Sequence, residues 1–303
     1  MSNLPLGVAL ALLATVCFSF AILLSTVGSR RLDSDAGALL AGAANVPVGL
    51  ALVGLQALAG GWPAAPTAWG LTAFALGGLC ATFLGRWLFF SSIRLLGPTR
   101  ATVFQTLSPL AAALMAWGLL GERLTWAGWL GMGLAAAGLV VMTQRGRGAP
   151  AVQAMPRIAL AFGFGSAVAY AGGSIFRASA LESWNEALAG AAVGAVAGFG
   201  MLLLAARRRL PGVRAQIAAH PRSAQLFVGV GTLQIVAQGL MIASLNHIPV
   251  SLTVLLTSCT PLLVMPLSAW LLRRDETLDA RAVIGVVVTC AGVALATGWG
   301  APR

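Results

Sequence analysis

The chain has 303 residues, of which 58% are hydrophobic and only 9% are charged. Soluble domains carry about 25% charged residues, so this composition excludes a soluble globular fold and indicates that lipid surrounds the chain. The formal net charge is +11, and every basic side chain is arginine because the sequence contains no lysine. The arginines form short clusters between apolar runs, which is typical of membrane-protein loops and argues against nucleic acid as a partner.

Runs free of Asp, Glu, Lys and Arg predict the membrane-spanning helices in chain order. A helix needs roughly 20 apolar residues to cross the hydrocarbon core. Two runs are long enough for two helices each, and the breakers 60–63 and 246–249 divide them. The runs are 4–28, 36–85, 101–121, 124–144, 158–176, 187–206, 223–272 and 282–302. They predict an all-α membrane protein with ten transmembrane helices.

The stretch 98–142 resembles the stretch 249–297. Both contain a proline after Ser or Thr, a Glu-x-Leu sequence and two glycines seven positions apart, in the same order. The matched residues are Pro109, Glu122, Gly131 and Gly138 in the first stretch and Pro261, Glu276, Gly285 and Gly292 in the second. A chance match between Leu/Ala/Gly-rich helices is the alternative, which the shared order disfavours.

This similarity divides the chain into a first repeat of five helices (1–144), a linker (145–156) and a second repeat (157–303). Because five is odd, the second repeat enters the membrane from the opposite side, as in the inverted repeats of many secondary transporters. We expect the glycine pairs to permit close helix packing, either within the fold or between protomers.

The arginines predict the orientation. Nearly all of them lie in the loops expected after helices 1, 3, 5, 7 and 9, whereas the opposite side has Arg123 and Arg303. The positive-inside rule therefore places the arginine-rich loops in the cytoplasm and both termini outside.

The repeat resembles the EamA-type half of the drug/metabolite transporter superfamily. The resemblance rests on Pro98 and Pro109, on the sequence 121–124 (Gly-Glu-Arg-Leu) and on the Gly131/Gly138 helix, and the second half carries a weaker form at Asp275-Glu276. It implies a ten-helix basket around a central cavity formed mostly by helices 1, 3, 4, 6, 8 and 9, with helices 5 and 10 at the periphery. It also implies a bacterial inner-membrane protein that exports amino acids or related metabolites. Relatives often have cytoplasmic termini, which the arginines here contradict.

No acidic residue is expected in the middle of the membrane. All eight acids fall at predicted helix ends or in loops: Asp33, Asp35, Glu122, Glu182, Glu186, Asp275, Glu276 and Asp279. A proton-coupled exporter of cationic drugs uses a buried acid that exchanges its proton for the cation. Drug or organic-cation efflux is therefore the less favoured alternative. For Glu122 and Glu276 we expect a mainly structural role.

Two arginines interrupt apolar runs. We expect Arg177 to reach the interface by snorkelling, with Glu182 as a partner. Arg86 has a different setting, because the repeats align Thr82 and Arg86 with Gln234 and Gln238. Both pairs are spaced four residues apart, so each pair lies on one helix face. These faces either line a cavity or form hydrogen bonds between helices.

Proline and tyrosine positions complete the predicted substrate site. Pro109 and Pro261 are expected near the middles of helices 4 and 9, where each proline frees the carbonyl four residues earlier, that of Gln105 or Thr257. We interpret them as gating kinks, or alternatively as static kinks. Tyr170 is the only tyrosine and needs a partner for its hydroxyl. The predicted substrate-binding residues are Thr82, Arg86, Gln105, Tyr170, Gln234, Gln238, Thr257 and Ser258. For Asn45 we expect a structural role.

The sequence thus favours a secondary transporter of small polar metabolites, most plainly an exporter of amino acids or related zwitterionic or anionic compounds. An enzyme is not expected, because His220 and His247 lie in loops and the sequence has no metalloprotease motif and no aspartate pair in the middle of the membrane. The four cysteines lie in apolar runs as core residues, so neither metal nor cofactor is predicted. A noncatalytic scaffold is the third alternative. The expected partners are a small-molecule substrate and the lipid bilayer, and the chain is expected as a monomer, with a homodimer as the alternative.

Overall fold

The computed structural model describes residues 3–96, 104, 107–143, 157–260, 262–264, 267 and 280–299. Within these residues every regular element is a helix, which confirms the all-α class. In chain order the elements are α1 (Leu4–Gly28), α2 (Ser34–Gly60), α3 (Ala68–Gly78), the π-helix η1 (Leu79–Gly85), α4 (Arg86–Leu96), α6 (Ser108–Leu119), α7 (Trp126–Thr143), α8 (Arg157–Ser183), α9 (Ala187–Ala206), α10 (Leu210–Ala219), α11 (Pro221–Ser244), α12 (Val250–Ser258) and α14 (Ala280–Trp299).

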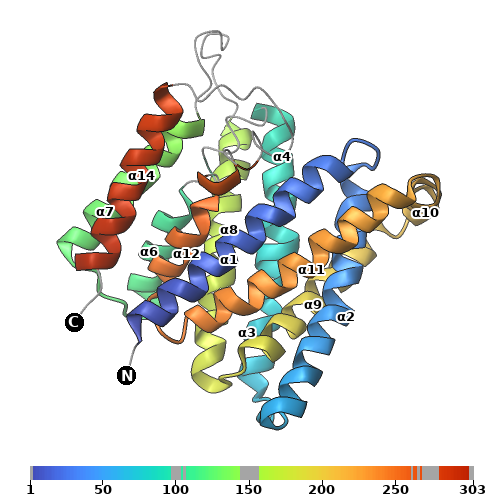
Figure 1. The fold of residues 1–303 in the computed structure, drawn as a ribbon, viewed down its shortest axis with the longest axis horizontal. Coiled ribbons are helices and arrows are strands. Elements are labelled where there is room, and N and C mark those ends of the chain that lie inside the picture. Colours follow the sequence, from blue (N-terminus) through green and yellow to red (C-terminus); the bar gives the residue numbers. More distant parts are fainter. Residues whose placement is uncertain are drawn as a thin grey trace.

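In the part of the chain that the structure describes, six helices are long and apolar enough to cross a membrane. They are Leu4–Gly28, Asp35–Gly60, Ala68–Phe89, Arg157–Ser183, Ala187–Ala206 and Pro221–Ser244. Four shorter apolar helices, α6, α7, α12 and α14, lie where the fourth, fifth, ninth and tenth spans were predicted. α1 begins and α14 ends at the same end of the bundle, as an even number of crossings requires (Figure 1). The short helix α10 was not predicted and lies in the arginine-rich segment after α9.

Local sequence sets where the helices begin. The Asp33 carboxylate accepts a hydrogen bond from the Ala36 amide (3.0 Å) and caps α2, and the Thr67 hydroxyl accepts one from the Gly70 amide (3.0 Å) and caps α3. Such side chains satisfy amides that have no partner within the helix. After α2 the chain turns at Gly61, whose φ of 94° is a conformation that glycine adopts without strain.

Helices of the first repeat pack mainly on helices of the second. α1 contacts α11, and α3 contacts α8. In addition, α2 contacts α9, α6 contacts α12, and α7 contacts α14. Exchanging the two repeats converts the first contact into the second and maps the other three pairs onto themselves. The packing therefore has the pseudo-two-fold pattern expected of inverted repeats, with each repeat completed by the other.

α7 and α14 lie side by side at one edge of the bundle (Figure 1). A Cβ placed on Gly131 would lie 2.6 Å from the Ala296 amide nitrogen and 2.7 Å from the Gly292 carbonyl oxygen, so the two backbones are nearly in contact. Two helical turns further along α7, a Cβ placed on Gly138 would likewise lie against the Gly285 carbonyl oxygen and the Thr289 amide nitrogen of α14. The glycine pairs thus pack the two repeats together within one chain, as small residues do in membranes.

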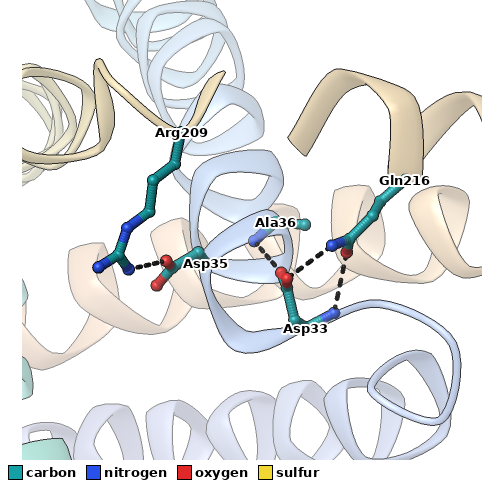
Figure 2. A network of polar contacts seen from close by, with 5 residues as sticks. All are labelled: Asp33, Asp35, Ala36, Arg209 and Gln216. Carbon is teal, nitrogen blue, oxygen red and sulfur yellow. Dashed lines mark hydrogen bonds and ion pairs between the residues drawn. The ribbon is translucent and has the colours of Figure 1, made fainter. Parts of the chain in front are cut away.

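Polar contacts also join the repeats where α2 begins (Figure 2). The Arg209 guanidinium donates to Asp35 at 2.7 Å, and the Gln216 amide donates to Asp33 at 2.7 Å. Arg209 and Asp35 are 76% and 49% exposed, so solvent and salt weaken their attraction. This network, Asp33, Asp35, Arg209 and Gln216, lies at the arginine-rich end of the molecule.

The α7–α14 interface predicts a contrast between two glycines of one helix. Gly131→Ala places a methyl group against the α14 backbone and should destabilise the protein by about 1–3 kcal/mol, because a packed interface must move apart. Gly133 has no atom within 4 Å of an added Cβ, so Gly133→Ala serves as the matched control. Thermal unfolding of both variants in detergent measures the difference, and equal melting temperatures would contradict the described interface.

Candidate functional site: a polar cavity between the repeats

A cavity of about 720 Å³ lies in the bundle. It is bordered by α1, α2, the α3–η1–α4 helix, α6, α8, α9, α11 and α12, and its lining residues fall in the middle part of most of these helices. Its size is that of pockets that bind small ligands. The cavity lies where helices of the first repeat face helices of the second, and α2 and α9 line it in addition to the helices expected.

The structure brings together seven of the eight predicted substrate-binding residues. Thr82 and Arg86 line the cavity from η1 and α4, and Gln234 and Gln238 line it from α11, so both aligned pairs face the same space. The remaining three are Tyr170 of α8 and Thr257 and Ser258 of α12. Gln105 lies outside the described residues. Of the two predicted alternatives, the structure therefore shows the first: both pairs line a cavity, rather than only forming hydrogen bonds between helices.

A π-helix precedes Arg86, which the sequence did not predict. η1 spans Leu79–Gly85 between the α-helical segments α3 and α4. A Cβ on Gly85 would lie 3.1 Å from the Cys80 carbonyl oxygen and from the ring atoms of Tyr170, so the backbone is crowded at this point. π-helical turns are rare, and they occur often at functional sites because they change which side chains face inward. Here η1 contributes Thr82 to the cavity and ends immediately before Arg86.

Arg86 and Tyr170 are partners. The Arg86 guanidinium lies beside the Tyr170 hydroxyl and interacts with it. This contact joins α4 of the first repeat to α8 of the second. The hydroxyl of the only tyrosine therefore lies next to a polar group, as a tyrosine inside the bundle requires. Substrate contact by Tyr170 stays a prediction.

Arg177 was expected to reach the membrane interface, and this expectation is wrong. Its side chain is only 5% exposed and lines the cavity. A Cβ on Gly77 would lie 3.0 Å from the Arg177 Cγ, so that glycine leaves room for the arginine stem. Tyr170, Ser174 and Arg177 follow one another at intervals of four and three residues, which places them on one face of α8. The sequence already contains this spacing, and it could have shown that Arg177 shares a helix face with Tyr170 and Ser174.

Two buried oxygens at the cavity have no hydrogen-bond donor among the described residues. They are Asn45 Oδ1 on α2 and Gln238 Oε1 on α11. A buried polar atom without a partner is costly, so its presence in a native fold calls for an explanation. Asn45 was expected to be structural; its side chain borders the cavity, and its role stays a prediction. Both oxygens are covered in this structure, so a donor on a ligand would reach them only after the amide side chains turn toward the cavity.

α9 lines the cavity with its smallest residues. Gly190, Ala191, Gly194 and Ala195 all border the space, and a Cβ on Gly78 would lie 2.6 Å from the Gly194 Cα. The α3 and α9 backbones therefore touch beside the cavity. Small side chains both allow this contact and leave volume free on the neighbouring positions.

Pro109 does not lie in the middle of a helix. α6 begins at Ser108, and Leu107 before it has φ −85° and ψ −9° in a turn. Pro109 thus occupies the first helical turn, where its missing N–H removes no intrahelical bond. The helix is interrupted at this point rather than kinked.

α12 is interrupted at the corresponding place. It ends at Ser258 and turns at Cys259, two residues before Pro261, which lies outside the described residues. The Thr257 carbonyl, which was expected to be free, accepts a hydrogen bond from the Thr260 hydroxyl at 2.7 Å. The Thr257 side chain still borders the cavity.

The model of the EamA-like transporter family matches the chain twice, at residues 5–144 and 157–298. The chain belongs to the EamA-like transporter family. This EamA-like protein is a multi-pass membrane transporter of small molecules. A solved crystal structure shares its fold with a TM-score of 0.75 and 19% identity, and the alignment covers 96% of each chain. No curated protein matches the sequence.

Glu122 fixes the position of α12 in this EamA-like protein. Its carboxylate accepts hydrogen bonds from the Val250 amide (2.6 Å) and from the Ser251 hydroxyl (3.1 Å). Glu122 follows α6 in the first repeat, and α12 belongs to the second. A carboxylate at a helix N-terminus also interacts favourably with the helix dipole. The structural role predicted for Glu122 is therefore what the contacts show, and it holds the helix that presents Thr257 and Ser258.

This cap predicts the effect of removing the Glu122 carboxylate. Glu122→Ala leaves two partly buried donors of α12 without an acceptor and should destabilise the EamA-like protein by about 1–3 kcal/mol. Arg123 is adjacent and exposed, so Arg123→Ala should change stability by less than about 0.5 kcal/mol. Thermal unfolding of the purified variants compares them, and an unchanged melting temperature for Glu122→Ala would refute the cap.

Proposed function

We propose that this protein is a secondary transporter that exports small polar metabolites, namely amino acids or related zwitterionic or anionic compounds, by alternating access. The observation that carries the proposal is the polar cavity between two inverted repeats, in which Arg86 lies beside Tyr170. A guanidinium group binds a carboxylate with two parallel hydrogen bonds, so Arg86 suits a carboxylate-bearing substrate. The transporter family supports transport rather than catalysis.

Alternating access is supported by contacts between the repeats at both ends of the cavity. Where α2 begins, the network of Figure 2 joins the repeats. Where α2 ends, the Glu186 carboxylate accepts from the Gln56 amide (2.9 Å) and the Ala64 backbone amide (2.8 Å). The Trp184 indole donates to the Ala64 carbonyl at 2.8 Å. Rocking of one repeat on the other would open one set while the other holds, with the helix interruptions near Pro109 and Pro261 as gating positions.

In this proposal the protein lies in the bacterial inner membrane as a monomer, with its arginine-rich end in the cytoplasm. The exposed arginines after α9 lie at that end, as the positive-inside rule requires. Organic-cation efflux is disfavoured because no carboxylate borders the cavity among the described residues. A scaffold has no need of a polar cavity of this size.

Arg86→Ala tests the proposal. The variant should lose at least about tenfold of the transport rate, because the carboxylate of the substrate loses a charge-assisted pair. Transport is measured in proteoliposomes with a panel of labelled amino acids, organic acids and organic cations, with and without a pH gradient. Arg208→Ala, an exposed arginine at the end of the molecule, is the control and should transport normally.

Equal melting temperatures and elution profiles for the two variants establish that folding is intact. Unchanged transport by Arg86→Ala would rule out a role for this arginine. Preferential transport of organic cations by the wild-type protein would replace the proposed function with drug efflux.

A further inference from the structure

Two arginines line the cavity, Arg177 buried and Arg86 partly buried, and no described carboxylate neutralises them. Arg86 and Arg177 both border the space. The described acids lie elsewhere: Asp33 and Asp35 in the network of Figure 2, Glu122 at the start of α12, Glu182 exposed at the end of α8, and Glu186 bonded to Gln56 and Ala64. A charge held away from water is unfavourable unless it is paired. A substrate that brings two acidic groups would pair with both arginines.

The two arginines lie at different levels along α8. Arg86 of α4 lies beside Tyr170, and Arg177 of α8 follows Tyr170 by seven residues, which is about 10 Å along the helix axis at 1.5 Å per residue. Ser174 lies between them on the same face and also borders the cavity. The arginines and this face of α8 form a cationic wall, defined by Arg86, Tyr170, Ser174 and Arg177. Its short length suits a compact molecule with acidic groups at its two ends.

Asn45 Oδ1 on α2 and Gln238 Oε1 on α11 are buried without donors among the described residues, and we call these two oxygens the acceptor wall. Their helices α2 and α11 pack on each other. α8 packs instead on α3, η1, α4, α6 and α12, so the cationic wall and the acceptor wall face the cavity from different helices. Oxygen acceptors with no donor fit a positively charged donor group such as an ammonium. The cavity is therefore bordered by two cations on one side and, on another, by two amide side chains whose covered oxygens lack donors.

We infer that the substrate is a dicarboxylic amino acid, whose two carboxylates bind Arg86 and Arg177 and whose ammonium group donates to Asn45 and Gln238. This inference rests on the proposed function and narrows its substrate class. A neutral amino acid leaves one arginine unpaired. A dicarboxylate without an amine leaves both oxygens unsatisfied.

Binding of glutamate, glutamine and succinate to the full-length protein in nanodiscs tests the inference. The wild-type protein should bind glutamate at least about tenfold more tightly than either of the others, because each comparison removes one charged contact. Arg177→Gln should lower the affinity for glutamate by at least about tenfold and that for glutamine by less than about threefold. Arg177→Lys keeps the charge and should retain the preference for glutamate, which separates the role of charge from a packing defect.

Gln238→Leu addresses the acceptor wall. It removes an acceptor with little change in volume and should weaken glutamate binding more than succinate binding. Arg208→Gln is the control for a distant arginine and should bind all three compounds as the wild-type protein does.

Two results would overturn the inference. Equal affinities for glutamate and glutamine, or an equal loss of both in Arg177→Gln, would remove the two-arginine site. Succinate binding as tight as glutamate binding would remove the ammonium contact. In both cases transport of another metabolite by the wild-type protein in proteoliposomes leaves the proposed function standing. Failure of the folded wild-type protein to transport any member of the metabolite panel would reject the proposed function itself.

Discussion

Backbone contact at glycine positions is the constraint on which the rest of this structure depends. Helices in a bilayer gain little from burying apolar side chains, because lipid is equally apolar, so they associate where small residues let them approach closely. Gly78 of α3 touches Gly194 of α9, and Gly131 of α7 meets the backbone of α14. Each of these contacts joins one repeat to the other. The repeats are therefore packed by backbone fit, and large side chains such as Leu130 and Val287 are left to face the lipid.

The same small residues make the polar cavity tolerable. Because α9 presents glycine and alanine to the centre, the long side chains of Arg86 and Arg177 have room beside α8. Arginine is suited to such a place, since its guanidinium is more weakly hydrated than an ammonium group and bonds in a fixed planar geometry. The family resemblance explains the scaffold, whereas the charge of the cavity is a property of these particular side chains.

Much of the architecture was predictable because apolar runs and repeated motifs are local signals. The runs located the helices, and the alignment of Thr82 and Arg86 with Gln234 and Gln238 singled out four residues that border one cavity. Arg177 was misplaced, because a charge near the end of a run is read as interfacial unless its helical neighbours Tyr170 and Ser174 are considered. The Pro109 kink was misplaced because a proline predicts a break but not which side of it is helical. Neither η1 nor the close contact of α3 with α9 leaves a local signal, since both depend on partners distant in the chain.

The π-helix η1 has a consequence for how such a binding site changes in evolution. A π-helical turn holds one residue more than an α-helical turn, so the loss of one residue within Leu79–Gly85 would restore α-helical turns and leave the helix after it facing as before. The loss would change which side chain of this segment, Thr82 or a neighbour, borders the cavity, while α3 kept its contact with α9 and α4 its contact with α8. Insertion or deletion of a single residue within η1 is thus a route by which one scaffold exchanges the chemistry of its binding site without repacking its helices.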